Sequence, residues 1–194
     1  MHRLMLALAR FMAIAGGAVL SLLILLTCIS ITGRLLNGLF HGDWMESIAP
    51  GFSAWVLGLG VGPVNGDFEL VEAGVAFAIF AFLPLCQITS GHAAVDIVAN
   101  HFPSWLSRFL RAATEVVFAV VLVLIAERLF EGMMSKKGYG ETTFLLQFPI
   151  WWAYAASLAG AVVAAVVAVY MAVVRCYESL TGRVLIHDGV ETGT

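Results

Sequence analysis

Charged residues are scarce in this sequence, and their scarcity excludes most classes of soluble protein. Only 12% of the 194 residues are Asp, Glu, Lys or Arg, whereas 61% are hydrophobic. A typical soluble domain has about 25% charged and about 45–50% apolar residues. The 10 Lys and Arg residues, set against 13 Asp and Glu, also provide too little positive charge for a surface that binds nucleic acid. The composition therefore indicates a small protein that crosses a membrane several times.

Residues that would hold a metal, a cofactor or a nucleophile are also few. The three cysteines lie far apart, and the five histidines fall outside the apolar stretches or at their edges. A haem-binding helical bundle needs histidines within its spans. The sequence has no HExxH, GxSxG or Walker-type motif. We therefore predict no catalytic site, no metal and no cofactor.

Long apolar stretches are abundant instead. A membrane-spanning helix needs roughly 20 apolar residues, because the hydrocarbon core is about 30 Å thick and each helical residue rises about 1.5 Å. We predict four transmembrane helices, at about 11–33, 70–90, 109–134 and 150–174. The first stretch is too long for a typical signal peptide, and no small-x-small cleavage site follows it, so it counts as a span.

The third of these spans contains the shortest uncharged stretch. Only Val116 to Ala126 is free of charge, so a three-span protein is the alternative. Long charged side chains near the ends of a span can nevertheless reach the headgroups. The predicted fold is an all-α integral membrane protein with one membrane domain, residues 1–194, and four transmembrane helices.

The distribution of Lys and Arg predicts which side of the membrane each connection occupies. With the N-terminus inside, the cytoplasmic side carries six of these residues and the opposite side carries four. The six are Arg3, Arg10, Arg108, Arg111, Arg175 and Arg183, and the four are Arg34, Arg128, Lys136 and Lys137. Because basic residues accumulate in cytoplasmic loops, we predict an N-in/C-in orientation. Residues 34–67 then form a long periplasmic connection.

Two segments, one between spans and one overlapping the start of the third span, have the pattern of short amphipathic helices at the membrane surface. In the long connection, apolar residues recur every three or four positions, and Pro50 interrupts the pattern. These residues are Trp44, Ile48, Phe52, Trp55, Val56 and Leu59. A re-entrant or simply apolar loop is the alternative here. The other segment is 105–111, which follows Ser104, a residue type common at N-caps. The tail, 176–194, is predicted to be frayed or only briefly structured.

Small residues recur at every fourth position on the first and fourth spans. Such spacing lets helix backbones approach each other closely in a membrane. The set on the fourth span is Ala156, Gly160, Ala164, Ala168 and Ala172, and the set on the first span is Ala9, Ala13, Gly17 and Ser21. We predict that the fourth-span set faces protein rather than lipid.

Acidic residues on the third span are candidates for a role inside the membrane. Glu115 has Arg111 four residues away, and Glu131 has Arg128 three residues away, so both can form ion pairs. Glu127 lacks such a partner, and an unpaired carboxylate in a membrane indicates a function. The alternative is that Glu127 reaches periplasmic water. We predict that Glu127→Gln lowers complex assembly or transport, whereas Glu115→Gln does little.

Three groups of residues carry a family resemblance. Gly91, His92 and Asp96 lie directly after the second span, in GHAAVD, and Glu72 lies near the start of that span. The segment ETTFLLQFPIWWAY, which begins with Glu141 and leads into the fourth span, also contains Thr142, Pro149 and Trp152. In this order and spacing, over about residues 68–174, they resemble the small permease of TRAP (tripartite ATP-independent periplasmic) transporters.

This resemblance implies a function and a set of partners. Such subunits lie in the bilayer beside a large permease, and they act mainly as a scaffold. A periplasmic binding protein delivers an organic acid or related solute, which is imported by use of an ion gradient. His92 and Asp96 would brace a cytoplasmic turn, and Glu141 and Thr142 would cap the fourth helix or contact the partner. The chain departs from the family in its long first connection and in the residues just before the glycine-histidine pair, where the family often has a basic residue and this chain has Gln87, Thr89 and Ser90.

Three other functions remain open at this point. The small four-span subunit of a tripartite tricarboxylate transporter has the same size and number of spans. A membrane anchor subunit of a redox enzyme is a different class, which the histidine positions disfavour. An assembly factor without a transport role is the third.

Overall fold

Four long helices and one short helix make up the described part of the chain, in a computed structural model that describes residues 2–42, 50–58, 60, 62–89 and 104–181. The helices are α1 (His2–Phe40), α3 (Pro50–Gly58), α4 (Asp67–Ile88), α6 (Ser104–Tyr139) and α7 (Trp151–Thr181). All except α3 contain a stretch long and apolar enough to cross a membrane. The prediction of an all-α membrane protein with four spans, including the third, is therefore confirmed.

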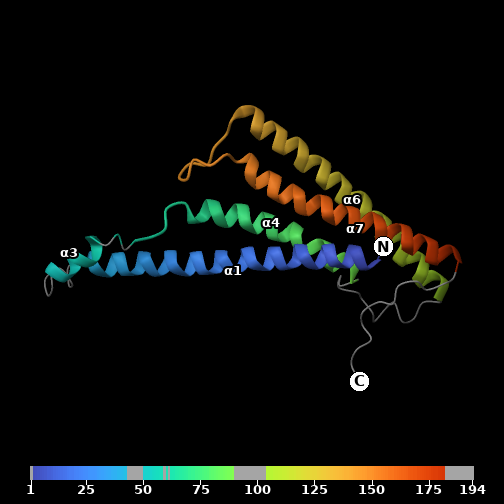
Figure 1. Ribbon diagram of the computed structural model, residues 1–194, viewed down its shortest axis with the longest axis horizontal. Coiled ribbons are helices and arrows are strands. Elements are labelled where there is room, and N and C mark those ends of the chain that lie inside the picture. Colours follow the sequence, from blue (N-terminus) through green and yellow to red (C-terminus); the bar gives the residue numbers. More distant parts are fainter. Residues whose placement is uncertain (1, 43–49, 59, 61, 90–103, 182–194) are drawn as a thin grey trace, which may run out of the picture.

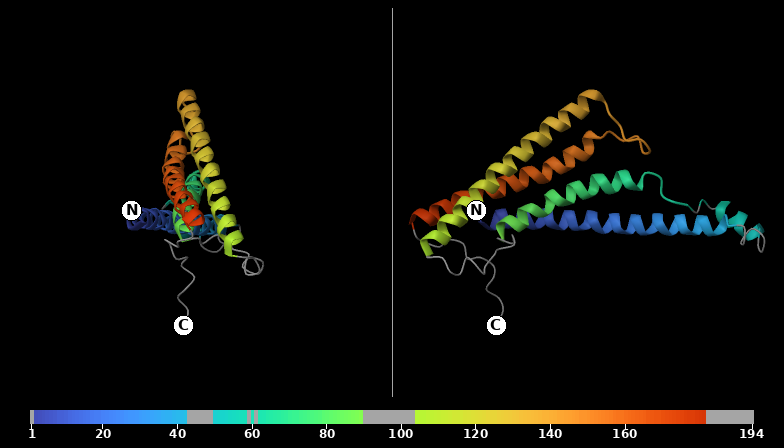
Figure 2. Two further views of the ribbon diagram at one scale, coloured as in Figure 1. Left: turned by 90° about the vertical axis from the view of Figure 1, so that its right-hand side faces the viewer. Right: turned by 180° about the vertical axis from the view of Figure 1, so that it is seen from behind.

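The four long helices form two antiparallel hairpins. α1 lies beside α4 and α6 lies beside α7, while α7 also packs on α4 and so joins the two pairs. The hairpins come together at the end where α1 begins and α7 ends, and they spread apart toward the other end (Figures 1 and 2). We call this other end, where α4 and α7 begin, the loop end. It holds the α6–α7 loop, residues 140–150.

α1 extends beyond the predicted 11–33 span in both directions, and its last turns form the start of the predicted long connection. Apolarity marks only the part of a helix that lies in hydrocarbon, whereas the helix itself continues until something breaks it. α3 begins at Pro50. Proline is tolerated in the first turn because its missing N–H would have no helical partner there. Pro50 thus begins a helix, while Trp44, Ile48 and Leu59 lie outside the described residues.

α6 is one continuous helix of 36 residues. This helix begins at Ser104, so the segment 105–111 forms its first turns. The sequence had predicted a separate surface helix for this segment. That prediction is wrong because no glycine or proline separates the amphipathic segment from the apolar stretch. α7 likewise continues to Thr181, so the tail is helical over residues 176–181, and its remainder lies outside the described residues.

The small residues of α7 face protein, as predicted, with one exception. Gly160, Ala164, Ala168 and Ala172 are buried, whereas Ala156 is exposed and not covered by the described part of this chain. The three buried alanines form one core cluster with Ala119 and Leu122 of α6. A Cβ atom on Gly160 would lie 2.9 Å from the Cβ of Phe80 and 3.1 Å from its carbonyl carbon, so α7 approaches the backbone of α4 there.

The small residues of α1 are offset from the face that packs on α4. A Cβ atom on Gly16 would lie 2.9 Å from the Cβ of Ala81, whereas one on Gly17 would have no atom within 4 Å. Gly74 of α4 packs in turn against Val19 and Leu23. Of the predicted set on this helix, Ala9 is fully buried and Ser21 is exposed.

Candidate functional site

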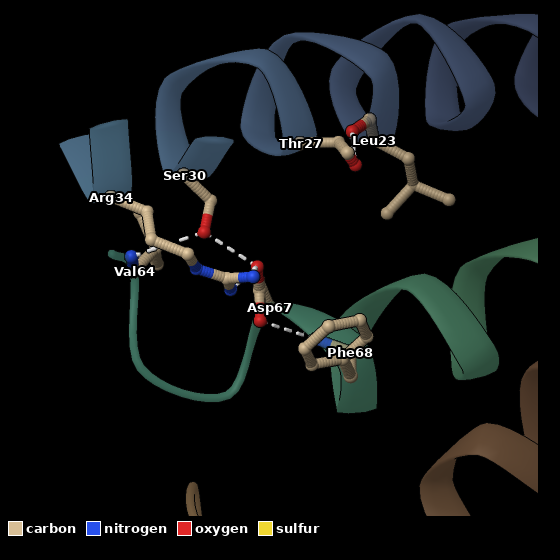
Figure 3. Close-up of polar contacts among 7 residues, drawn as sticks. All are labelled: Leu23, Thr27, Ser30, Arg34, Val64, Asp67 and Phe68. Atoms are coloured by element: carbon tan, nitrogen blue, oxygen red, sulfur yellow. Dashed lines mark hydrogen bonds and ion pairs between the residues drawn. The ribbon is translucent and has the colours of Figure 1, made fainter. Parts of the chain in front are cut away.

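An acidic first turn on α4 connects both hairpins at the loop end. Asp67 is buried there, and its carboxylate Oδ2 accepts a hydrogen bond of 2.5 Å from the hydroxyl of Ser30 on α1 (Figure 3). The guanidinium of Arg34, one turn further along α1, lies 3.8 Å from the same oxygen. A carboxylate is also favoured at the N-terminus of a helix by the helix dipole. Asp67 therefore joins the start of α4 to α1.

Glu69 joins the same turn to the α6–α7 loop. Its two carboxylate oxygens accept hydrogen bonds from the backbone N–H groups of Leu145 at 2.7 Å and Leu146 at 2.9 Å. The side chain of Leu146 also packs on Gly66, where an added Cβ would lie only 2.4 Å from Leu146 Cγ. Gly66 has φ of +78°, a conformation that glycine adopts without strain. The loop is thus held against α4 by both polar and apolar contacts.

The α6–α7 loop is also held at its own ends. Lys136 Nζ, in the last turns of α6, lies 2.6 Å from Oε2 of Glu141 and forms an ion pair with it. The backbone carbonyl of Glu141 accepts a hydrogen bond of 3.1 Å from the N–H of Ile150, directly before α7. Thr142 and Pro149 form an isolated β-bridge across the loop.

A cleft of about 510 Å³ lies where the hairpins spread apart. Its walls come from α4, from the loop and from α7, with Leu129 contributed by α6. The polar side chains in the walls are Glu69, Glu72, Thr142, Thr143, Tyr154 and Ser157. Phe80, Phe144 and Phe148 are among the apolar ones. The cleft therefore combines an acidic mouth with apolar walls.

A second polar connection lies closer to the opposite end. The Nε2 atom of Gln87 on α4 donates a hydrogen bond to the carboxylate of Glu115 on α6, and both side chains are buried. On α7, Arg175 and Glu178 form a buried ion pair with an N–O distance of 2.8 Å. Buried polar groups are stable only when such partners are present. These contacts explain how polar groups are accommodated among apolar helices.

The predicted site residues lie in several places. Glu72 and Thr142 line the cleft, and Gly160 packs on α4. Trp152 is exposed at the start of α7, so Pro149 and the tryptophans do mark the beginning of that helix. Gly91, His92 and Asp96 lie outside the described residues.

The burial of the acids on α6 differs from what their spacing suggested. Glu127 is exposed on the helix surface. Arg128 and Glu131 form the predicted ion pair, at 2.7 Å. Glu115 is the buried acid of this helix, and its carboxylate contacts Gln87 of another helix.

The sequence contained only partial signals for the residues that join the helices. Ser30 and Arg34 are four residues apart and so share a helix face, and Asp67 and Glu69 follow a glycine at the start of an apolar stretch. These patterns indicate a helix start and a polar patch. They do not indicate that the two meet, because contacts between helices far apart in sequence have no local signal.

Among the described residues, no group of three or more His, Cys, Asp or Glu side chains comes together in a way that could hold a metal ion. Asp67, Glu69 and Glu115 instead connect one helix to another, or one helix to a loop. The fold and its contacts therefore define a small helical protein of the membrane, whose helices are joined by internal polar contacts.

The comparison with protein families identifies the particular kind of membrane protein. The family described as "Tripartite ATP-independent periplasmic transporters, DctQ component" matches residues 23–177, which is most of the chain. The chain belongs to this family, and it is a small membrane component of a TRAP transporter in the inner membrane. The match extends the predicted resemblance of 68–174 into the first span. Comparisons with curated proteins and with solved structures gave no match.

Proposed function

We propose that this chain is the scaffold subunit of its transporter, and that it holds a large permease in place while that permease moves the solute. The resemblance supports ion-gradient-driven import of an organic acid or related solute, delivered by a periplasmic binding protein. In this proposal the N-terminus and the C-terminus are cytoplasmic, and the loop end faces the periplasm. The excess of Lys and Arg near the other end supports this orientation.

One observation carries the proposal: several acidic side chains inside the described helices join those helices to each other or to a loop. Asp67 bonds to Ser30, Glu69 to the α6–α7 loop, and Glu115 to Gln87. A pathway for a solute or ion would need polar groups that stay available along the span. A preassembled body with an apolar exterior is instead suited to supporting another membrane protein.

The exterior of α1 is the surface that we propose for the permease. Of its most apolar 18 residues, 11% are buried, compared with 50% for α7. Large apolar side chains are exposed along its whole length, among them Phe11, Ile14, Leu22, Ile24, Leu25 and Ile29. Helices in lipid associate through close packing, and α1 has the largest free surface for it.

Co-purification with the large permease tests this proposal. A tagged permease should retain this chain through detergent extraction and size-exclusion chromatography. A photo-crosslinking amino acid at Leu25 should then capture the permease, while one at Val162, which is exposed on α7, should not. A chain that purifies as a stable monomer, without the permease, and transports solute by itself would overturn the proposal.

A further inference from the structure

Two polar groups in the loop-end cleft are not used by the internal contacts described above. Glu72 is exposed there and has no hydrogen bond or ion pair with any described residue. Ser157 is only 3% exposed, and its hydroxyl likewise has no hydrogen-bond partner in the described part of the chain. The hydroxyl of Ser157 is not one of the buried side-chain atoms that lack a partner, so it opens into the cleft, where a ligand can donate or accept a hydrogen bond.

The cleft continues into an apolar groove on the outside of the protein. This groove, of about 400 Å³, shares Phe80 and Leu129 with the cleft. Its other walls are Val121, Leu124, Ile125 and Arg128. Val121 precedes Leu129 by two turns of α6, so the groove runs about 12 Å away from the loop end, along the direction of the span. Val121 and Leu124 are exposed, which leaves the groove open toward the bilayer.

The combined shape is that of a headgroup site joined to a site for a hydrocarbon chain. Because the helices that form it are long and apolar enough to cross a membrane, the groove faces lipid wherever no partner protein covers it. A carboxylate in a partly apolar cleft favours a cationic group, and a primary ammonium can also donate hydrogen bonds to Glu72 and Ser157. The guanidinium of Arg128, in the wall of the groove, uses one nitrogen for its ion pair with Glu131 and has further N–H groups that suit a phosphate.

From this arrangement we propose that the cleft and groove bind one phospholipid with a primary amine headgroup. Its ammonium contacts Glu72, and one acyl chain lies along the groove between α4 and α6. The lipid then fills the space between the two hairpins and stabilises their spread arrangement. A basic side chain of a partner protein could also meet Glu72, but it would leave the apolar groove empty, so the lipid accounts for both features.

Lipid binding to the full chain tests the proposal without reference to transport. The chain is purified in detergent, delipidated and incubated with phosphatidylethanolamine or with phosphatidylglycerol, which has the same acyl chains and no amine. Native mass spectrometry should show one retained phosphatidylethanolamine per chain. Phosphatidylglycerol should bind about tenfold more weakly, the factor expected for one charge-assisted hydrogen bond.

Variants at the two ends of the site separate the possible outcomes. Glu72→Gln should remove the preference for the amine lipid, and Val121→Trp, which fills the groove, should weaken both lipids. Glu127→Gln, an exposed acid of α6 outside both lining sets, is the matched control and should bind as the unmodified chain does. Ser157→Ala provides a second test of the headgroup site if Glu72→Gln does not fold.

Two results would overturn the proposal. One is equal binding of the two lipids, because it would mean that the cleft does not recognise an amine. The other is a Glu72→Gln chain that keeps its lipid preference but loses the permease, which would assign Glu72 to a protein partner.

Discussion

At the scale of single residues, the beginning of α4 shows how a chain with few charges uses them. Asp67, Glu69 and Glu72 lie within two turns, and since successive residues are separated by about 100° they point in different directions. Asp67 faces α1, Glu69 faces the α6–α7 loop, and Glu72 lines the cleft. The spacing predicts that these side chains diverge. It does not predict what each one meets.

Neutralising Asp67 should weaken the connection between α1 and α4. In Asp67→Asn the Ser30 hydroxyl loses a charged acceptor, which should lower the free energy of unfolding by about 1–3 kcal/mol. Thermal unfolding followed by circular dichroism in detergent measures the loss. Glu127→Gln removes a charge from an exposed position and should leave the transition unchanged. Equal transitions for the two variants would contradict this role of Asp67.

The two acids of α6 should differ in how much they contribute to the stability of the chain. Glu115 is the buried one, and it accepts a hydrogen bond from Gln87, so Glu115→Leu should cost about 2–3 kcal/mol of stability. The same change at Glu127 should cost less than about 0.5 kcal/mol, as is usual for an exposed position.

The double variant Gln87→Leu/Glu115→Leu is the control for this pair. Replacing both partners by apolar residues leaves neither polar group buried alone, so the double variant should regain part of the stability that Glu115→Leu loses. A double variant less stable than Glu115→Leu would show that the buried contact is not the cause.

At the scale of elements, the sequence predicted the helices well but their ends less well. Hydropathy identifies the stretch of each helix that lies in hydrocarbon, and Pro149 with the following tryptophans marked the beginning of α7. Ser104 was a predicted N-cap, but the extension of α1 to Phe40 and the continuation of 105–111 into the third span were not predicted, because polar turns continue a helix without a break. The two hairpins pack through contacts such as that of Gly160 with Phe80. The spacing of the small residues indicates which face of α7 makes such contacts, but not which helix this face meets.

Gly160 should be intolerant of even a methyl group. In Gly160→Ala the new Cβ meets the side chain and the carbonyl carbon of Phe80, so α4 and α7 must separate, at a cost of about 1–3 kcal/mol. Gly17→Ala introduces the same methyl group on α1, at a position where no atom lies within 4 Å of the added Cβ. This variant should keep or slightly raise the melting temperature. Similar melting temperatures for the two variants would contradict the close approach of α4 and α7.

Removing the carboxylate of Glu69 should release the α6–α7 loop. In Glu69→Ala the N–H groups of Leu145 and Leu146 lose their acceptors, so hydrogen exchange at these two amides should be about tenfold or more faster. Exchange in α7 should stay the same, because its hydrogen bonds are within the helix. Unchanged exchange at Leu145 and Leu146 would mean that Glu69 does not hold the loop. Glu131→Ala, which breaks an exposed ion pair on α6, is the matched control.

At the scale of the whole molecule, the scarcity of charge has a specific meaning. The described charges lie at helix ends, on the outer surface or in contacts that join helices, and a wide apolar surface on α1 is not covered by the described part of the chain. Sequence composition could establish that the protein is membrane-embedded, and its motifs could indicate the family. Which surface is free for a partner depends on how the hairpins pack, and it became visible only in the fold.

The measurement that tests the scaffold role most directly is solute uptake into proteoliposomes. Vesicles containing the large permease and this chain, with the periplasmic binding protein and its solute outside, should accumulate the solute when an ion gradient is applied. Vesicles that contain only the permease, or only this chain, should not. Unchanged uptake when this chain is left out, or uptake by this chain alone, would contradict the account.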